Sequence, residues 1–203
     1  MAEPLRLLVY DRTRRDPLSL AWRSGSVLYR GLGRIDATFG ATSWVEAFEW
    51  LANVNAGRAI AEVQYWGHGK WGEALIGEDR LSIASLERGP LHAPLVQMRE
   101  RLVGPAALWW WRTCETFGAR AGHDFAIAWT RFLGCASAGH TYVIGAWQSG
   151  LHSLALGETP TWSPHEGLEA GTPEAPESSL MSHRTAPSTI HFLSRRVPRS
   201  AFS

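Results

Sequence analysis

The chain has 203 residues, of which 45% are hydrophobic and 19% charged, and its formal net charge is only +1. This length is enough to bury a core, so we expect one folded domain, with or without a tail. The near-neutral charge gives no electrostatic basis for binding nucleic acid or an anionic membrane surface. Because the sequence has neither an apolar run approaching the roughly 20 residues that span a bilayer nor the pattern of a secretory signal, it predicts a cytoplasmic protein.

Two residue types stand out in the composition. The only cysteines are Cys114 and Cys135, and two thiols in an intracellular chain of this size are expected to be reduced. The chain also has 11 tryptophans, which gather around residues 66–71 and 109–111. Large aromatic side chains bury much area each, so they are expected either to fill the core or to line a groove.

The amino-terminal quarter predicts a strand and then a helix. Residues 5–11 form a short apolar run of strand length. Residues 12–40 are rich in Arg, Gly and Ser, and only a strand near 26–30 is indicated there. Residues 42–54 predict an amphipathic helix, because a Ser43–Glu46 capping box precedes apolar residues at helical spacing, namely Trp44, Ala47, Phe48 and Leu51.

The next segments alternate between strand and helix patterns. The mostly apolar residues 58–66 predict a strand that ends at the glycine-flanked His68, and residues 73–77 predict a further short strand. Residues 93–102 predict a second helix, with Leu95, Met98 and Leu102 on one face.

The run of three tryptophans predicts a buried strand over residues 106–111, because three consecutive indoles cannot face one side of a helix. Strand alternation then places Trp109 and Trp111 on one face and Trp110 on the other. A glycine-rich loop follows, and residues 123–134 predict a helix that ends at Gly134, where a left-handed C-cap belongs. Residues 140–147 predict another strand.

Strands that alternate with helices at this spacing favour a mostly parallel central sheet covered by helices. We therefore expect an α/β fold with the three layers of an α/β/α sandwich over residues 1–158. Residues 159–203 carry Pro, Gly, Ser and Glu without periodicity, which predicts an irregular tail with a last short strand near 188–193.

Two of the predicted strands end beside a chemically useful residue, His68 in one case and Cys114 in the other. Ligands of open α/β sheets bind beyond the carboxyl ends of the strands, so parallel neighbouring strands would bring both side chains to one edge. The separation of 46 residues (114 − 68) leaves room for a crossover with one helix. An imidazole beside a thiol makes it an effective nucleophile, and a helix opening near Gly122 would favour the thiolate.

The segments "AIAEVQYWGHG" and "AALWWWRTC" together resemble the caspase-like cysteine peptidases, including their bacterial relatives. That family shares an apolar strand ending in His-Gly and a later apolar strand leading to the nucleophilic cysteine. The resemblance covers residues 58–147 and implies a caspase-like fold. It makes His68 the general base and acid, Cys114 the nucleophile, and the backbone amides of Gly69 and Cys114 an oxyanion hole.

This sequence departs from the family pattern on both sides of the cysteine. Thr113 precedes Cys114, and Glu115 follows it. A carboxylate next to a thiol raises the thiol pKa unless it points away. The residues expected to bind substrate are the two tryptophans around His68 and three polar residues near the predicted strand ends: Trp66, Trp71, Arg112, Gln148 and Ser149.

The function predicted from these residues is that of a cysteine endopeptidase that cleaves a protein or peptide through an acyl-enzyme. No cofactor is expected. His68, Cys114, His123, Cys135 and His140 could in principle converge on a metal ion, but the chain has no local pair of ligands at metal-binding spacing, so no metal site is expected either. Two alternatives are an inactive interaction module with the same fold, and acyl transfer or thioester hydrolysis on a small substrate by the same pair. The oligomeric state is not predicted.

Overall fold

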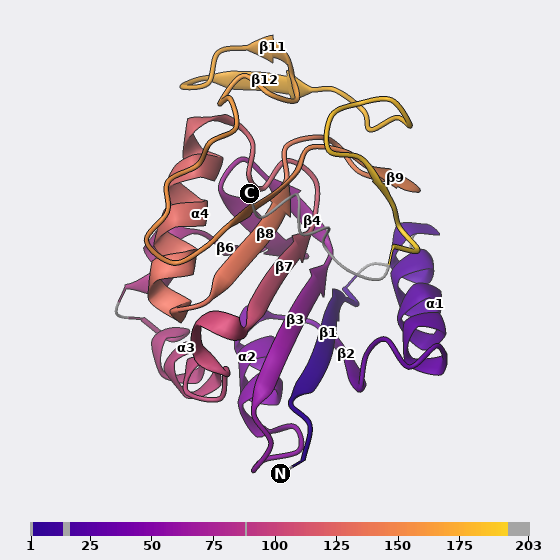
Figure 1. Ribbon diagram of the computed structural model, residues 1–203, viewed down its shortest axis with the longest axis vertical. Coiled ribbons are helices and arrows are strands. Elements are labelled where there is room, and N and C mark those ends of the chain that lie inside the picture. Colours follow the sequence, from indigo (N-terminus) through magenta and orange to yellow (C-terminus); the bar gives the residue numbers. More distant parts are fainter. Residues whose placement is uncertain (1, 14–16, 88, 195–203) are drawn as a thin grey trace.

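The computed structural model describes residues 2–13, 17–87 and 89–194 (Figure 1). Its centre is a six-stranded sheet in the order β10-β8-β7-β3-β1-β2. All strands of this sheet are parallel except β10, which pairs antiparallel with β8. The α/β fold with a mostly parallel sheet is therefore confirmed. The strands are β1 (Leu5–Asp11), β2 (Ala37–Ala41), β3 (Ile60–Trp66), β7 (Leu108–Arg112), β8 (Ala136–His140) and β10 (Leu151–Leu154).

Helices cover the two faces of this sheet unequally. One face packs against α2 (Trp44–Asn53), α3 (His92–Arg99) and α4 (Ala119–Leu133), which share one large apolar core with it. The other face has α1 (Pro17–Gly31), which stands beside β1 and β2 in Figure 1, and segments from the carboxyl-terminal part of the chain. This arrangement is compatible with an α/β/α sandwich. Two short 3₁₀ helices, Ile83–Leu86 and Gly104–Ala106, complete the helical elements of the described residues.

The tryptophans of β7 divide between the two faces as strand alternation predicts. Trp109 and Trp111 lie in the large core, where both pack against Trp129 of α4 with ring centroids 5.0 Å apart. Trp110 lies on the opposite face in a separate apolar cluster. All three are fully buried or nearly so. Most of the tryptophan content near β7 is therefore explained by core packing.

Several small strands lie outside the central sheet, and those from the later part of the chain stand above its carboxyl ends in Figure 1. One small sheet contains β4 (His68–Lys70), β5 (Glu73–Ile76) and β6 (Asp79–Leu81), which follow one another directly after β3. Two further antiparallel pairs come from later in the chain. They are β9 (Trp147–Gln148) with β13 (Ile190–His191), and β11 (Leu168–Gly171) with β12 (Pro176–Ser179).

The predictions of α2 and α4 are confirmed. Ser43 caps α2 by accepting a hydrogen bond from the backbone N–H of Glu46, while the Glu46 carboxylate accepts from Thr42 rather than from Ser43. Gly134 ends α4 in the left-handed conformation, with a φ of 68°. The helix begins at Ala119, four residues earlier than the apolar pattern of 123–134 indicates. The strand over 73–77 and the helix over 93–102 are also present, as β5 and α3.

Two of the sequence predictions are wrong. The strand expected near residues 26–30 belongs to α1, whose buried residues are Ser19, Ser26 and Tyr29, while apolar residues at helical spacing such as Leu18 and Leu28 remain partly exposed. The strand expected over 140–147 lies earlier, as β8. This strand is built from small residues because Phe117 packs on it: a Cβ at Gly139 would lie 2.6 Å from the Phe117 ring. Residues 141–146, despite their β-branched content, form a loop.

The carboxyl-terminal segment packs onto the domain over the residues that the structure describes. Trp162 is buried, stacks on Phe117 with centroids 5.7 Å apart and donates from its Nε1 to the Phe117 carbonyl, 3.1 Å away. The short strand expected near 188–193 is β13, and residues 195–203 lie outside the described residues. No helix among the described residues is long and apolar enough to cross a membrane.

The buried tryptophans allow a direct test of the core. Trp111→Ala is expected to lower the free energy of unfolding by about 3–5 kcal/mol, because the substitution removes a fully buried ring between α2 and α4. Urea unfolding followed by circular dichroism measures this loss. Trp147→Ala is the matched control, since that ring is 37% exposed, and its loss should be about 1 kcal/mol or less. Equal losses in the two variants would contradict the described core.

Candidate active site

The candidate site forms where the chain leaves two neighbouring parallel strands. β3 and β7 pair directly, with Trp66 opposite Arg112 at their carboxyl ends. His68 comes two residues after β3 and Cys114 two residues after β7. Both side chains line one cavity of about 520 Å³, as the sequence predicts for residues at a common sheet edge.

His68 is held at this edge by a sharp change of direction after β3. Gly67 allows the chain to pass over Tyr65, because any Cβ at this position would clash with the Tyr65 hydroxyl. His68 then opens β4, where it pairs with Leu75. Its ring packs edge-on against Trp22 of α1, with centroids 5.1 Å apart, and its Nε2 is buried without a hydrogen-bond partner among the described residues. Buried polar atoms are normally hydrogen-bonded, and a functional role is one explanation for the unpaired Nε2 of His68.

The glycine after His68 brings the two segments into contact. A Cβ at Gly69 would lie 2.8 Å from the backbone carbonyl oxygen of Cys114 and would clash with the Thr116 hydroxyl. Glycine is therefore needed here, since any side chain would push β4 away from the cysteine loop. Thr116 reinforces the contact, because its hydroxyl donates to the Glu73 carbonyl and its own carbonyl accepts from Gly72.

The loop after β7 holds Cys114 in a turn with an unusual backbone. Glu115 has a φ of 57°, in the left-handed region that side chains other than glycine rarely adopt. Its N–H donates to the Tyr142 carbonyl, and the Phe117 N–H donates to the His140 carbonyl. Strained residues persist only where the surroundings hold them, and they gather at functional sites.

The sulfur of Cys114 is engaged by a neighbouring loop rather than by the histidine. The Ile144 N–H donates to Sγ over 3.4 Å, and the thiol donates to the Ile144 carbonyl over 3.9 Å. Between the described side chains of Cys114 and His68 there is no hydrogen bond. The pKa of Cys114 is raised to about 11, mainly by burial and also by the Glu115 charge, while the hydrogen bond from Ile144 acts in the opposite direction. The thiolate expected from the sequence is therefore wrong for the resting protein.

Glu115 itself points toward the carboxyl-terminal segment. Its carboxyl hydrogen-bonds to Ser179 in β12, and burial raises its pKa above the ordinary value although Ser179 and Lys70 act in the opposite direction. Ser179 also accepts a hydrogen bond from Trp71 Nε1 over 3.2 Å. The carboxylate that follows the cysteine therefore serves a contact with β12.

Arg112 forms the floor of the cavity but is fully engaged by the protein. Its guanidinium donates to the side chains of Gln148, Tyr29 and Gln64 and to the Phe192 carbonyl. Its guanidinium carbon lies over the rings of Trp110 and Trp66, 4.6 and 4.9 Å from their centroids. Burial lowers the pKa of Arg112, and the Tyr29 hydroxyl offsets this most strongly.

The structure brings together some of the residues expected to bind substrate and separates others. Trp66, Arg112 and Gln148 line the cavity with His68 and Cys114. Trp71, Ser149 and Gly69 do not. Trp71 instead covers β12 with Lys70 above its ring, Ser149 is buried under residues 182–189, and Gly69 packs on the cysteine loop.

Several residues of the cavity wall were not found from the sequence. They belong to α1, to the loop that follows β8 and to the segment after β13: Leu18, Ala21, Trp22, Leu28, Ile144, Ala146 and Phe192. The α1 residues recur at the helical spacing 18, 21, 22, 25, 28, which is the one signal that could have found them. No local pattern points to Ile144 or Phe192, because both reach the site through tertiary contacts.

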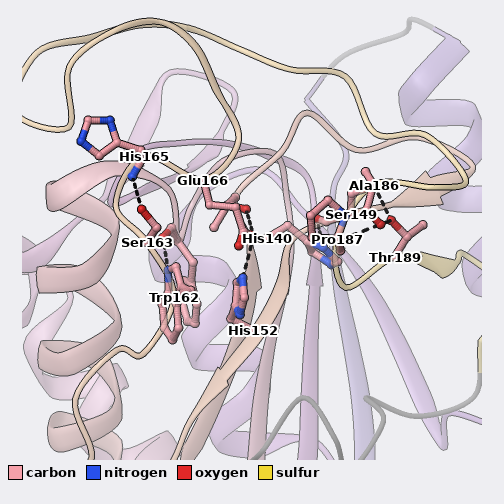
Figure 2. A network of polar contacts seen from close by, with 12 residues as sticks. His140, Ser149, His152, Trp162, Ser163, His165, Glu166, Ala186, Pro187 and Thr189 are labelled. Carbon is pink, nitrogen blue, oxygen red and sulfur yellow. Dashed lines mark hydrogen bonds and ion pairs between the residues drawn. The ribbon is translucent and has the colours of Figure 1, made fainter.

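A polar network joins the carboxyl-terminal segment to the loop 141–146, whose Ile144 hydrogen-bonds the sulfur of Cys114 (Figure 2). Glu166 accepts hydrogen bonds from His152 Nε2 over 2.7 Å and from the Thr141 hydroxyl over 2.9 Å. Thr141 begins the loop that contains Ile144, and Val143 of the same loop bonds to Leu180 and Ser182 through its backbone. His152 stacks on Trp162, 4.7 Å away. The carboxyl-terminal segment thus holds in place the loop 141–146, which hydrogen-bonds the thiol of Cys114.

The described residues offer no metal site, and the comparisons with known proteins assign the chain to no family. Within residues 2–13, 17–87 and 89–194 there is no group of three or more His, Cys, Asp or Glu side chains placed to hold a metal ion. No family model matches the chain, and neither a curated protein nor a solved structure matches it.

The raised pKa of the cysteine predicts slow alkylation. Iodoacetamide is expected to label Cys114 at pH 7 about a hundredfold more slowly than a free cysteine, and the rate should rise with pH toward a pKa of about 11. Mass spectrometry of the labelled peptide measures the rate at each pH. Cys114→Ala is the control for the buried Cys135, whose pKa burial raises to about 12. Rapid labelling with a plateau near neutral pH would contradict this description of the thiol.

The carboxylate of the network predicts a stability change in acid. Burial alone raises the pKa of Glu166, but the hydrogen bonds and charge of His152, with Thr141, bring it below the ordinary value of 4.5. A depressed carboxyl pKa contributes stability above the unfolded value, and this stability is lost as the pH falls through the folded value. Glu166→Gln should therefore cost about 1–2 kcal/mol at pH 7 and progressively less below pH 4.5.

Unfolding free energies measured between pH 7 and pH 3 test this expectation. Glu177→Gln is the matched control, since Glu177 is exposed on the nearby strand β12. A cost for Glu166→Gln that stays constant over the whole pH range would contradict the assigned ionisation.

Proposed function

We propose that the protein is a cysteine endopeptidase with Cys114 as nucleophile and His68 as general base and acid. The observation that carries the proposal is the meeting of these two side chains in one cavity, at the ends of directly paired parallel strands. The unpaired Nε2 of His68 supports it, because an imidazole nitrogen without a partner is free to accept a proton. The strained turn after Cys114 is a second support.

The proposed reaction has two stages. His68 takes the thiol proton as Sγ attacks the carbonyl carbon of a peptide bond, and the backbone N–H of Cys114 stabilises the oxyanion. Gly69, the second donor that the sequence resemblance implies, is left out of this role because it packs on the cysteine loop and does not line the cavity. The carbon–nitrogen bond then breaks as His68 gives its proton to the leaving amine. In the second stage His68 removes a proton from water, which attacks the acyl carbon and releases the thiol of Cys114 with the product acid.

The resting arrangement implies that substrate activates the thiol. A neutral thiol held by Ile144 reacts poorly, so Sγ has to turn from the Ile144 backbone toward the imidazole as the peptide enters. Proton transfer to a neighbouring base during attack avoids the need for a free thiolate beforehand. A raised pKa of Cys114 in the resting protein is therefore compatible with catalysis.

We also propose that the fold is caspase-like. An apolar strand ending in His68-Gly69, followed by an adjacent parallel strand leading to Cys114, has the order that the sequence resemblance implies. The substrate would then be a protein or peptide in the cytoplasm, where free thiols persist. Cys114 and Cys135 are both free, in agreement with that setting.

Two variants test the assignment of the nucleophile. The wild-type protein, Cys114→Ala and Cys135→Ala are incubated with a proteome-derived peptide library, and new amino termini are identified by mass spectrometry. Cleavage is expected from the wild type and from Cys135→Ala, and none from Cys114→Ala. His68→Gln should lower kcat at least a hundredfold. Equal cleavage by Cys114→Ala and the wild type would refute the assignment.

A second candidate is an inactive interaction module with the same fold. The burial of the Cys114 thiol and the neighbouring carboxyl of Glu115 favour it, because both raise the pKa of the thiol and so oppose thiolate formation. A peptidyl electrophile separates the two candidates. A peptidase should react with it at Cys114 near neutral pH much faster than with iodoacetamide, and His68→Gln should abolish the difference. An inactive module should show no such acceleration.

A further inference from the structure

The cavity beside Cys114 and His68 is lined mostly by apolar side chains. Leu18, Ala21, Trp22 and Leu28 of α1 form one part of its wall, and the loop 144–146 forms another. Its volume of about 520 Å³ lies within the range of about 300–1,000 Å³ typical of ligand pockets. A substrate held at Cys114 would therefore place a neighbouring side chain in this space.

Arg112 is the one permanently charged side chain among the described residues that line the cavity. Its donors are already committed to protein oxygens, two of them to Gln148 and one to the Phe192 carbonyl, at distances of 2.7–3.1 Å. The remaining donors contact Tyr29 and Gln64, and the guanidinium carbon also lies over the rings of Trp110 and Trp66. Only 4% of the residue is exposed. Arg112 therefore forms part of the cavity wall and has no free N–H donor for a substrate carboxylate.

The rest of the described wall would receive a charged side chain poorly. It provides no carboxylate for a lysine or arginine, and burying an unpaired charge is costly. Conversely, Leu18 and Leu28 are 51% and 45% exposed at the cavity wall. An apolar side chain seated between them and Ile144 would remove apolar surface from water on both partners.

We propose that this cavity is the specificity pocket of the peptidase and that it takes a large apolar side chain, such as leucine, methionine or phenylalanine. The inference rests on the proposed function and assigns the side chain to the residue that supplies the carbonyl attacked by Cys114. Leu28 is the specificity-determining residue that is simplest to alter, because it faces the cavity from a partly exposed position on α1.

A charge placed at residue 28 tests the assignment. Fluorogenic peptides that differ only in the residue before the cleaved bond, with Leu, Asp or Arg there, are compared by kcat/KM. The wild type should favour Leu at least a hundredfold over both charged residues. Leu28→Arg should raise the Asp-to-Leu ratio at least tenfold, because a new guanidinium at the cavity wall can pair with the carboxylate.

Val27→Arg is the matched control. Residue 27 carries the same new charge on the same helix, but its side chain is 67% exposed and is not part of the cavity wall. This variant should leave the Asp-to-Leu ratio at the wild-type value. A wild-type preference for Asp or Arg, or an equal change in the two variants, would overturn the pocket assignment while the role of Cys114 stands.

A binding measurement on Cys114→Ala separates this inference from the proposed chemistry, because it requires no turnover. Acetylated peptides that end in Leu, Asp or Arg are titrated while the tryptophan fluorescence is recorded, since Trp22 and Trp66 line the cavity. The peptide ending in Leu should bind at least tenfold more tightly than the others. Equal binding or no binding would overturn the inference. Apolar preference in binding without any cleavage by the wild type would support the pocket and contradict the peptidase.

Discussion

The parallel pairing of β3 with β7 is the constraint on which the site depends. Because Trp66 lies opposite Arg112, the chain leaves both strands at the same height and on the same edge of the sheet. Two residues later in each segment stand His68 and Cys114, which are far apart in the chain but line one cavity. If the order of these strands differed, no loop geometry would bring the imidazole and the sulfur to a common space.

Around this pair, the protein combines an apolar wall with a closely held thiol. Gly69 lets β4 lie directly on the cysteine loop, and the loop 141–146 binds the sulfur from the other side. The carboxyl-terminal segment secures that second loop through Glu166 and through the backbone of residues 180–182. The resting state is therefore one in which several tertiary contacts protect a neutral sulfur, and the proposed substrate has to replace one of them.

Much of the sheet and of the chemical pair could be predicted from the sequence. β3, β7, α2 and α4 have apolar patterns, caps or lengths that indicate their type, and the alternation of the three tryptophans follows from strand geometry. The order His-Gly and then Cys after two such strands was enough to predict a shared edge. These features are local, so a single sequence carries them.

The elements that the sequence did not reveal depend on tertiary packing. α1 buries two serines and a tyrosine, and a Cβ at its Gly25 would lie 2.7 Å from Trp66, so the buried side of this helix is not marked by apolar residues in the sequence. β8 is built from small residues that fit under Phe117, while the more β-prone 141–146 serves as a loop. The raised pKa of Cys114 arises mainly from burial, to which the Glu115 charge adds, and the extent of this burial is indicated by no motif near the cysteine.

The most direct measurement of the central claim is chemical cross-linking of the two side chains. A short bifunctional alkylating reagent such as 1,3-dibromoacetone attaches first to a thiol and then to any nucleophile within its short reach. After digestion, mass spectrometry should find the peptide containing Cys114 joined to the peptide containing His68, and His68→Gln should lack this product. Attachment at Cys114 alone in the wild type, with the second bromide lost to water, would contradict the proposal that imidazole and sulfur act together.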